Sequence, residues 1–123
     1  MLLPKRILIL EDEYFIAADC AKEVVRHRMA VIGLFETVES ALQTLAHDNP
    51  DGAIVDLKVQ EVMAFEVIEA LQDRGIPLVI YSGYDQVMLP KHLAEIVMVQ
   101  KLATPKEVVL TPLECMAGAA TSA

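Results

Sequence analysis

Residues 51–60 read Asp-Gly-Ala-Ile-Val-Asp-Leu-Lys-Val-Gln, a turn pair followed by a short apolar run and then a carboxylate. A short unbroken apolar run behind a turn signal is typical of a strand that is buried on both faces. We therefore expect Asp56 to lie where this strand leaves the core and reaches solvent. The stretch predicts a buried parallel sheet with a candidate functional carboxylate at its edge.

The composition indicates a single globular domain. The chain has 123 residues, of which 54% are hydrophobic and 23% charged. One domain should span residues 1–123, with a core at about 5–111 and a small-residue tail at 117–123 that is expected to fray. The net charge of −8 argues against nucleic acid or anionic membrane as a partner, because phosphates require a basic surface.

The sequence also predicts where the protein is found. The longest apolar runs are too short to span a membrane, and no apolar signal region follows a charged amino end. The two cysteines, Cys20 and Cys115, lie far apart in helix-like segments. We expect reduced thiols and a cytoplasmic location. A disulfide between the two cysteines is an alternative that the sequence does not exclude.

Apolar patterning predicts alternating strands and helices. The apolar runs that predict strands cover residues 7–10, 31–35, 53–55, 78–81 and 96–99. Apolar residues at helical spacing occur in residues 14–25, 38–46 and 64–71. Thr37 suits the N-cap of the second helix, and Gly75 suits the residue after the third. The alternation predicts parallel pairing in an open three-layer α/β sandwich with ligands at the carboxyl ends of the strands.

The carboxyl-terminal third of the chain predicts shorter helices. Pro90 interrupts residues 84–94, so one or two short turns are expected there. Thr104-Pro105-Lys106-Glu107 has the pattern of a capping box with proline at the first helical position, which predicts a helix start. Pro112 should kink or end that helix.

Polar side chains follow four of the predicted strands. Glu11 and Asp12 follow the first, Asp56 the third, Ser82 the fourth and Lys101 the fifth. Carboxylates brought close together repel one another, and Mg²⁺, which prefers oxygen ligands, relieves the repulsion. A lysine and a hydroxyl suit the oxygens of a phosphoryl group. The set predicts a metal-assisted phosphoryl site with Asp56 as nucleophile.

Each of these residues also has a simpler interpretation when it is taken alone. Asp12 would be a helix cap, Asp56 a turn or cap residue, Ser82 a turn residue and Lys101 a surface cation. The simpler interpretations require four independent coincidences at one sheet edge. We therefore favour the phosphoryl site.

These motifs resemble the receiver domain of two-component response regulators. The resemblance rests on Leu8-Ile9-Leu10-Glu11-Asp12-Glu13, Val55-Asp56-Leu57, Ile80-Tyr81-Ser82-Gly83 and Lys101, and it covers about residues 5–111. It implies a five-stranded parallel sheet in the order 2-1-3-4-5, with a short helix four and a short or kinked helix five. Ser82-Gly83-Tyr84 is similar to the alphaproteobacterial single-domain subgroup that carries Thr-Gly-Tyr after strand four.

The resemblance implies a role for each site residue. Asp56 would accept a phosphoryl group from a histidine kinase or a histidine phosphotransfer protein. The implied Mg²⁺ ligands are Glu11, Asp12, Asp56 and the backbone carbonyl of Lys58. Ser82 and Lys101 would contact the phosphoryl group, and Lys58, Tyr84 and Met98 would modulate the site. The chain would catalyse only its own phosphotransfer and dephosphorylation, and it would signal by a phosphorylation-dependent protein contact.

The sequence departs from the family pattern at three positions. Leu102 follows Lys101 where the family has proline, and a trans bond is expected because a non-proline cis bond costs about 3 kcal/mol. Met98 stands where many relatives carry a ring that swings, so a ring-burial switch is not expected. Pro112 weakens the last helix, which is part of a face that many relatives use to dimerise. A homodimer is therefore an alternative that the sequence does not exclude.

Three alternatives remain. A degenerate receiver could act as a phosphorylation-independent protein-binding module, which the missing proline after Lys101 favours. An aspartate-nucleophile phosphohydrolase would carry a second acid two residues beyond Asp56, where this chain has Lys58. A flavodoxin-type flavin site would share the topology, but the chain lacks a hydroxyl-rich phosphate loop and tryptophan.

Overall fold

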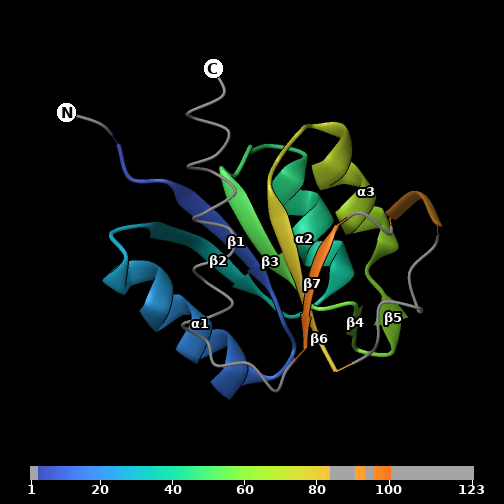
Figure 1. Cartoon of the computed structure of the whole chain (residues 1–123), viewed down its shortest axis with the longest axis horizontal. Coiled ribbons are helices and arrows are strands. Elements are labelled where there is room, and N and C mark those ends of the chain that lie inside the picture. Colours follow the sequence, from blue (N-terminus) through green and yellow to red (C-terminus); the bar gives the residue numbers. More distant parts are fainter. Residues whose placement is uncertain (1–2, 84–90, 94–95, 101–123) are drawn as a thin grey trace.

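Five strands form one parallel sheet in the order β2-β1-β3-β6-β7 (Figure 1). The structure is a computed structural model that describes residues 3–83, 91–93 and 96–100, with the backbone alone at 93 and 97–100. The strands are β1 (Arg6–Leu10), β2 (Ala30–Phe35), β3 (Gly52–Val55), β6 (Leu78–Ser82) and β7 (Val97–Gln100). Every neighbouring pair is parallel, which confirms the predicted order and fold class.

Helices cover both faces of the sheet. Helix α1 (Tyr14–Arg26) packs on one face, and α2 (Val38–Leu45) and α3 (Phe65–Asp73) pack on the other (Figure 1). Alternate residues of β1 serve the two layers, because successive side chains of a strand point to opposite faces. Ile7 and Ile9 belong to the α1 layer, and Leu8 and Leu10 belong to the α2–α3 layer.

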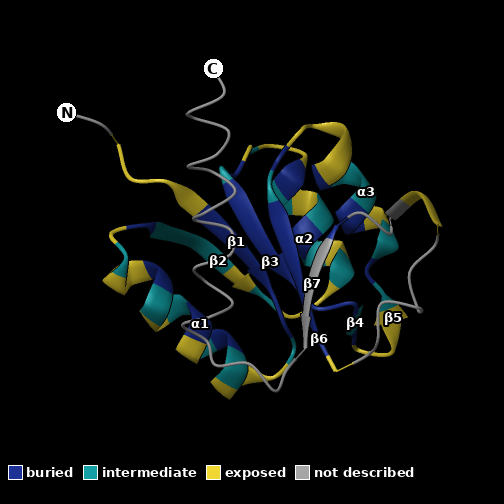
Figure 2. Ribbon diagram, viewed as in Figure 1, coloured by how far each residue is buried: buried dark blue, intermediate teal, exposed yellow. Residues whose placement is uncertain are grey.

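The central strands are mostly buried, as Figure 2 shows for β1 and β3, and in β1 only the first residue, Arg6, is exposed. All four residues of β3 are buried, and so are all five of β6. The apolar run within residues 51–60 therefore forms the central strand of the sheet, as predicted. Residues 91–93 form a single turn of 3₁₀ helix, within the segment where short turns were expected. The predicted helix from Thr104 lies outside the described residues.

The helix ends follow the predicted capping chemistry. The Thr37 hydroxyl oxygen accepts a hydrogen bond from the Ser40 backbone N–H at 3.1 Å. Gly75 has a φ of 68° and ends α3, with the Ile76 N–H donating to the Leu71 carbonyl at 3.0 Å. A glycine at this left-handed position avoids the crowding of a β-carbon.

The predicted apolar stripe of α1 is only partly buried. Ala17, Cys20 and Val24 face the sheet, whereas the Tyr14 and Val25 side chains are 66% and 64% exposed. Helical spacing indicates which residues share a stripe, but the layer packed against the helix decides how wide a stripe is covered. Cys115, the other cysteine, lies outside the described residues. No described helix is long and apolar enough to cross a bilayer.

A two-stranded hairpin between β3 and α3 was not predicted. Strands β4 (Lys58–Val59) and β5 (Val62–Met63) pair in antiparallel fashion around the two-residue loop Gln60–Glu61. Both loop residues are left-handed, with φ of 51° and 64°. A two-residue hairpin loop of this kind usually carries asparagine and glycine, so its sequence signal is missing here.

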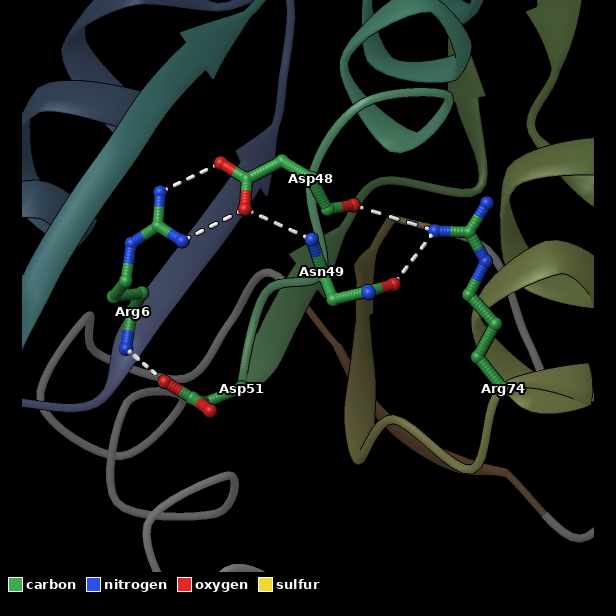
Figure 3. Close-up of polar contacts among 5 residues, drawn as sticks. All are labelled: Arg6, Asp48, Asn49, Asp51 and Arg74. Carbon is green, nitrogen blue, oxygen red and sulfur yellow. Dashed lines mark hydrogen bonds and ion pairs between the residues drawn. The ribbon is translucent and has the colours of Figure 1, made fainter.

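A polar network joins three segments at the amino-terminal edge of the sheet (Figure 3). The Arg6 guanidinium donates to both carboxylate oxygens of Asp48 at 2.7 and 2.6 Å, and its backbone N–H donates to Asp51 Oδ2 at 2.8 Å. The Arg74 guanidinium donates to Asn49 Oδ1 at 3.0 Å. The network ties the start of β1 and the end of α3 to the loop before β3.

Candidate acidic site at the carboxyl edge of the sheet

Strand register brings the predicted carboxylates together. Leu10 of β1 pairs with Val55 of β3, so the residues that follow them, Glu11 and Asp56, leave the sheet side by side. The Asp56 backbone N–H donates to the Leu10 carbonyl at 2.8 Å. Since parallel strands end at the same edge, sequence positions 45 residues apart meet here.

Three carboxylates form a compact cluster. One carboxylate oxygen from each of Glu11, Asp12 and Asp56 lies within 4.8 Å of the other two. Glu11 and Asp56 are only 4% and 5% exposed, and Asp12 is half-buried. Buried carboxylates at this separation require compensating positive charge, and an all-oxygen donor set suits a hard divalent cation such as Mg²⁺. The residues present therefore fit the metal that the sequence predicts.

The cluster opens into a cavity of about 390 Å³ at the edge of the sheet. The described residues that line it are Asp12, Glu13, Asp56, Lys58, Gln60, Glu61 and Gly83. Four of these carry carboxylates and one carries an ammonium, so the described part of the lining has a net negative charge at neutral pH. Such a lining concentrates cations at the mouth of the site.

The hairpin forms one wall of this cavity. The Gln60 backbone N–H donates to Asp12 Oδ2 at 3.0 Å, and Lys58 Nζ lies 3.2 Å from Glu61 Oε2. The Lys58 backbone N–H reaches Asp56 Oδ1 at 3.5 Å. Gln60 and Glu61 were not predicted as site residues. The only sequence signal for them is their place four and five residues after the candidate nucleophile.

Asp12 does not cap α1. The N-cap of α1 is Glu13, and no side chain caps this helix end. The carboxylate of Asp12 instead bonds the hairpin and points to the same cluster as Glu11 and Asp56. The structure thus excludes the simpler interpretation of this residue.

Of the remaining predicted residues, Ser82 and Met98 lie among the described residues, and Tyr84 and Lys101 do not. Ser82 is the last residue of β6 and is fully buried, and Gly83 next to it lines the cavity. Met98 lies in β7, where its backbone pairs with Ile80, and its side chain is not described. Tyr84 and Lys101 lie outside the described residues, so their predicted roles stay predictions.

Comparison with known proteins identifies the fold. No protein-family model and no curated protein matches the chain. A response regulator receiver domain protein (CheY-like) from Methanospirillum hungatei JF-1 superimposes with a TM-score of 0.83 at 19% identity, covering 98% of this chain and 99% of that one.

Two further solved structures have the same fold. SdrG from Sphingomonas melonis Fr1 has a TM-score of 0.79 at 27% identity, with 95% of this chain and 99% of that one covered. The N-terminal domain of a response regulator/sensory box/GGDEF 3-domain protein from Carboxydothermus hydrogenoformans has a TM-score of 0.78 at 22% identity, with 96% and 98% covered. The chain therefore has the fold of the response regulator receiver domains.

Proposed function

We propose that the protein is a phosphoacceptor receiver that takes a phosphoryl group onto Asp56 and signals by a phosphorylation-dependent protein contact. The observation that carries the proposal is the cluster of Glu11, Asp12 and Asp56 oxygens within 4.8 Å of one another, at the carboxyl edge of a receiver fold. The phosphodonor would be a histidine kinase or a histidine phosphotransfer protein in the cytoplasm.

The chemistry is a phosphoryl transfer between two side chains. A carboxylate oxygen of Asp56 attacks the phosphorus of a phosphohistidine, and the phosphorus–nitrogen bond breaks. The leaving imidazole keeps the bonding electron pair and takes a proton from solvent. Asp56 then carries an acyl phosphate, and attack by water at phosphorus later releases inorganic phosphate and restores the carboxylate.

The described residues prepare Asp56 for this step. Its backbone N–H is held by the Leu10 carbonyl, so the side chain starts from a fixed point at the end of β3. Burial of Asp56 limits the water that could compete with the donor. When bound by Glu11, Asp12, Asp56 and the backbone carbonyl of Lys58, Mg²⁺ would neutralise charge on the phosphoryl oxygens.

Ser82 and Lys101 complete the proposed site. Ser82 stands at the carboxyl end of β6, the neighbour of β3, where its hydroxyl can donate to a phosphoryl oxygen. Ser82 pairs with Gln100 in β7, and Lys101 is the next residue in the chain, which supports its assignment to the same edge. Lys58, which lines the cavity, together with Tyr84 and Met98, would modulate the lifetime of the acyl phosphate. Membership of the subgroup with Ser/Thr-Gly-Tyr after strand four is part of the proposal.

The test is phosphorylation by a small-molecule donor. The protein is incubated with acetyl phosphate and Mg²⁺, and its intact mass is measured. We expect a gain of one phosphoryl group that requires Mg²⁺ and is absent in Asp56→Asn. Asp73→Asn, which changes an exposed acid at the end of α3, is the matched control and should keep the gain. No gain in the wild type, or an equal gain in Asp56→Asn, would contradict the proposal.

A degenerate receiver that binds a partner without phosphorylation is the second candidate, and Leu102 in place of the usual proline after Lys101 favours it. The two candidates differ in their response to beryllofluoride, a mimic of the phosphoryl group. Tight beryllofluoride binding in the presence of Mg²⁺ that is lost in Asp56→Asn supports the phosphoacceptor. Its absence in the wild type supports the degenerate module.

A further inference from the structure

A groove of about 670 Å³ opens between α2, the β4–β5 hairpin and the start of α3, and we call it the α2–hairpin groove. Val38 and Leu42 of α2 line it together with Ala46, the C-cap residue of that helix, and Val59 and Val62 line it from the hairpin. The α2 residues are spaced by four, so they form one stripe along the helix. The Val62 side chain is 51% exposed, so the groove offers apolar surface to solvent.

Among the described residues that line the groove, the charged side chains are all acidic. Glu39 of α2 and Glu66 of α3 stand at its rim, and both are exposed. The remaining polar lining residues are neutral: Thr37, Gln43 and Gln60. A partner that brings lysine or arginine beside its apolar side chains therefore meets a complementary surface.

The same charges disfavour a second copy of this chain as the occupant. In a symmetric dimer through this groove, Glu39 and Glu66 of each copy would face a surface that carries the same two carboxylates. The chain as a whole has a net charge of −8, which adds to the repulsion. The charge pattern thus selects a basic partner.

We propose that the α2–hairpin groove is a docking surface for a basic amphipathic helix of a partner protein. A helix lays apolar side chains at positions i, i+3, i+4 and i+7 into a groove of this kind. The aliphatic stripe of α2 runs along one wall and can pack against such a row, while lysines on the flanks of the partner helix face Glu39 and Glu66.

The groove shares a wall with the acidic site. Gln60 borders both the α2–hairpin groove and the acidic cavity, and its backbone N–H bonds Asp12. A helix docked against Val62 therefore contacts the hairpin that holds a carboxylate of the cluster. The surface is present in the chain as described, so docking does not require a phosphoryl group on Asp56.

The probe is a fluorescent synthetic helix made of leucine and lysine, with leucines at positions i, i+3, i+4 and i+7. Binding to the full chain is followed by fluorescence anisotropy without Mg²⁺ or phosphodonor. We expect saturable one-to-one binding that is about tenfold weaker for Val62→Ser, because a buried aliphatic contact is lost. Val25→Ser, which changes another exposed valine, on α1, should bind like the wild type.

Charge is tested with matched neutral variants and a reversed probe. The double variant Glu39→Gln, Glu66→Gln should weaken binding and reduce its salt dependence, whereas Asp73→Asn should not. A leucine–glutamate helix of the same pattern should not bind. Amide chemical-shift changes in the wild type should be largest in α2 and residues 58–63, a measurement that does not depend on how any variant folds.

Several outcomes would overturn the proposal. The contact would lie elsewhere if Val62→Ser and Val25→Ser weakened binding equally, or if the leucine–glutamate helix bound as well as the leucine–lysine helix. Chemical-shift changes concentrated on α1 would also place the contact elsewhere. A dimer in sedimentation that Val62→Ser dissolves would assign the groove to a second copy of the chain. A failure of Asp56 phosphorylation leaves all of these measurements unchanged, so the two proposals fail separately.

Discussion

The left-handed hairpin loop beside the acidic site leads to a sharp prediction about stability. Gln60 and Glu61 have φ of 51° and 64°, a region that residues other than glycine and asparagine rarely adopt. Replacing Glu61 by glycine removes the β-carbon that is crowded in this conformation. We therefore expect Glu61→Gly to raise the free energy of unfolding, although glycine is ordinarily destabilising within a strand or helix.

The size of the gain follows from three contributions. A left-handed L-residue costs about 1–2 kcal/mol, and the greater freedom of glycine in the unfolded chain offsets about 0.5–1 kcal/mol of the relief. The Lys58–Glu61 ion pair is lost, but the Glu61 side chain is 92% exposed and such pairs contribute only about 0.3 kcal/mol. The net gain is about 0.2–0.7 kcal/mol, or roughly 1–4 °C in Tm.

Two other positions in the chain provide matched controls for thermal denaturation. Arg28 follows α1 with a φ of 62°, so Arg28→Gly should also raise Tm. Gly75 follows α3 with a φ of 68°, and a β-carbon there would have no neighbour within 4 Å, so Gly75→Ala should lower the free energy of unfolding by about 1 kcal/mol through the backbone alone. A lower Tm for Glu61→Gly, with the two controls behaving as expected, would refute the strain at the loop.

Three further predictions concern the sheet edges and the core. The Arg6 side chain hydrogen-bonds Asp48 and lowers the pKa of its carboxyl group, so this pair adds stability above the unfolded carboxyl pKa of about 3.9 and loses it as the pH falls through the lowered value. Asp48→Asn should accordingly lower Tm at neutral pH, and urea titrations should show the difference shrinking in acid. MgCl₂ at ten times its Kd should stabilise the wild type by about 1.4 kcal/mol relative to NaCl of equal ionic strength, and Asp12→Asn should respond less at the same concentration. Leu71→Ala, at a fully buried position of α3, should cost about 2–5 kcal/mol in chemical denaturation, and a cost under 1 kcal/mol would show that the core closes around the gap.

The main sheet could be predicted because its central strands β3 and β6, and β1 after Arg6, are buried on both faces. Such strands appear as unbroken apolar runs, and the polar residues at their ends mark the functional edge. The β4–β5 hairpin could not be predicted, because Gln60 and Glu61 carry no local turn signal. The exposure of Tyr14 and Val25 on α1 was also missed, since spacing alone does not show which part of a helix the sheet covers.

The sequence by itself determined which strands end in carboxylates and hydroxyls, and hence that Glu11, Asp56 and Ser82 lie at one edge of the sheet. It could not decide whether Asp12 caps α1 or joins the acidic cluster, because both roles suit an acid before a helix. The tertiary structure decided this, since the hairpin brings the Gln60 N–H, 48 residues away in sequence, to 3.0 Å from the Asp12 carboxylate. Contacts of this kind depend on the register between β1 and β3 and on the folding of the loop beyond them, which local sequence patterns do not encode.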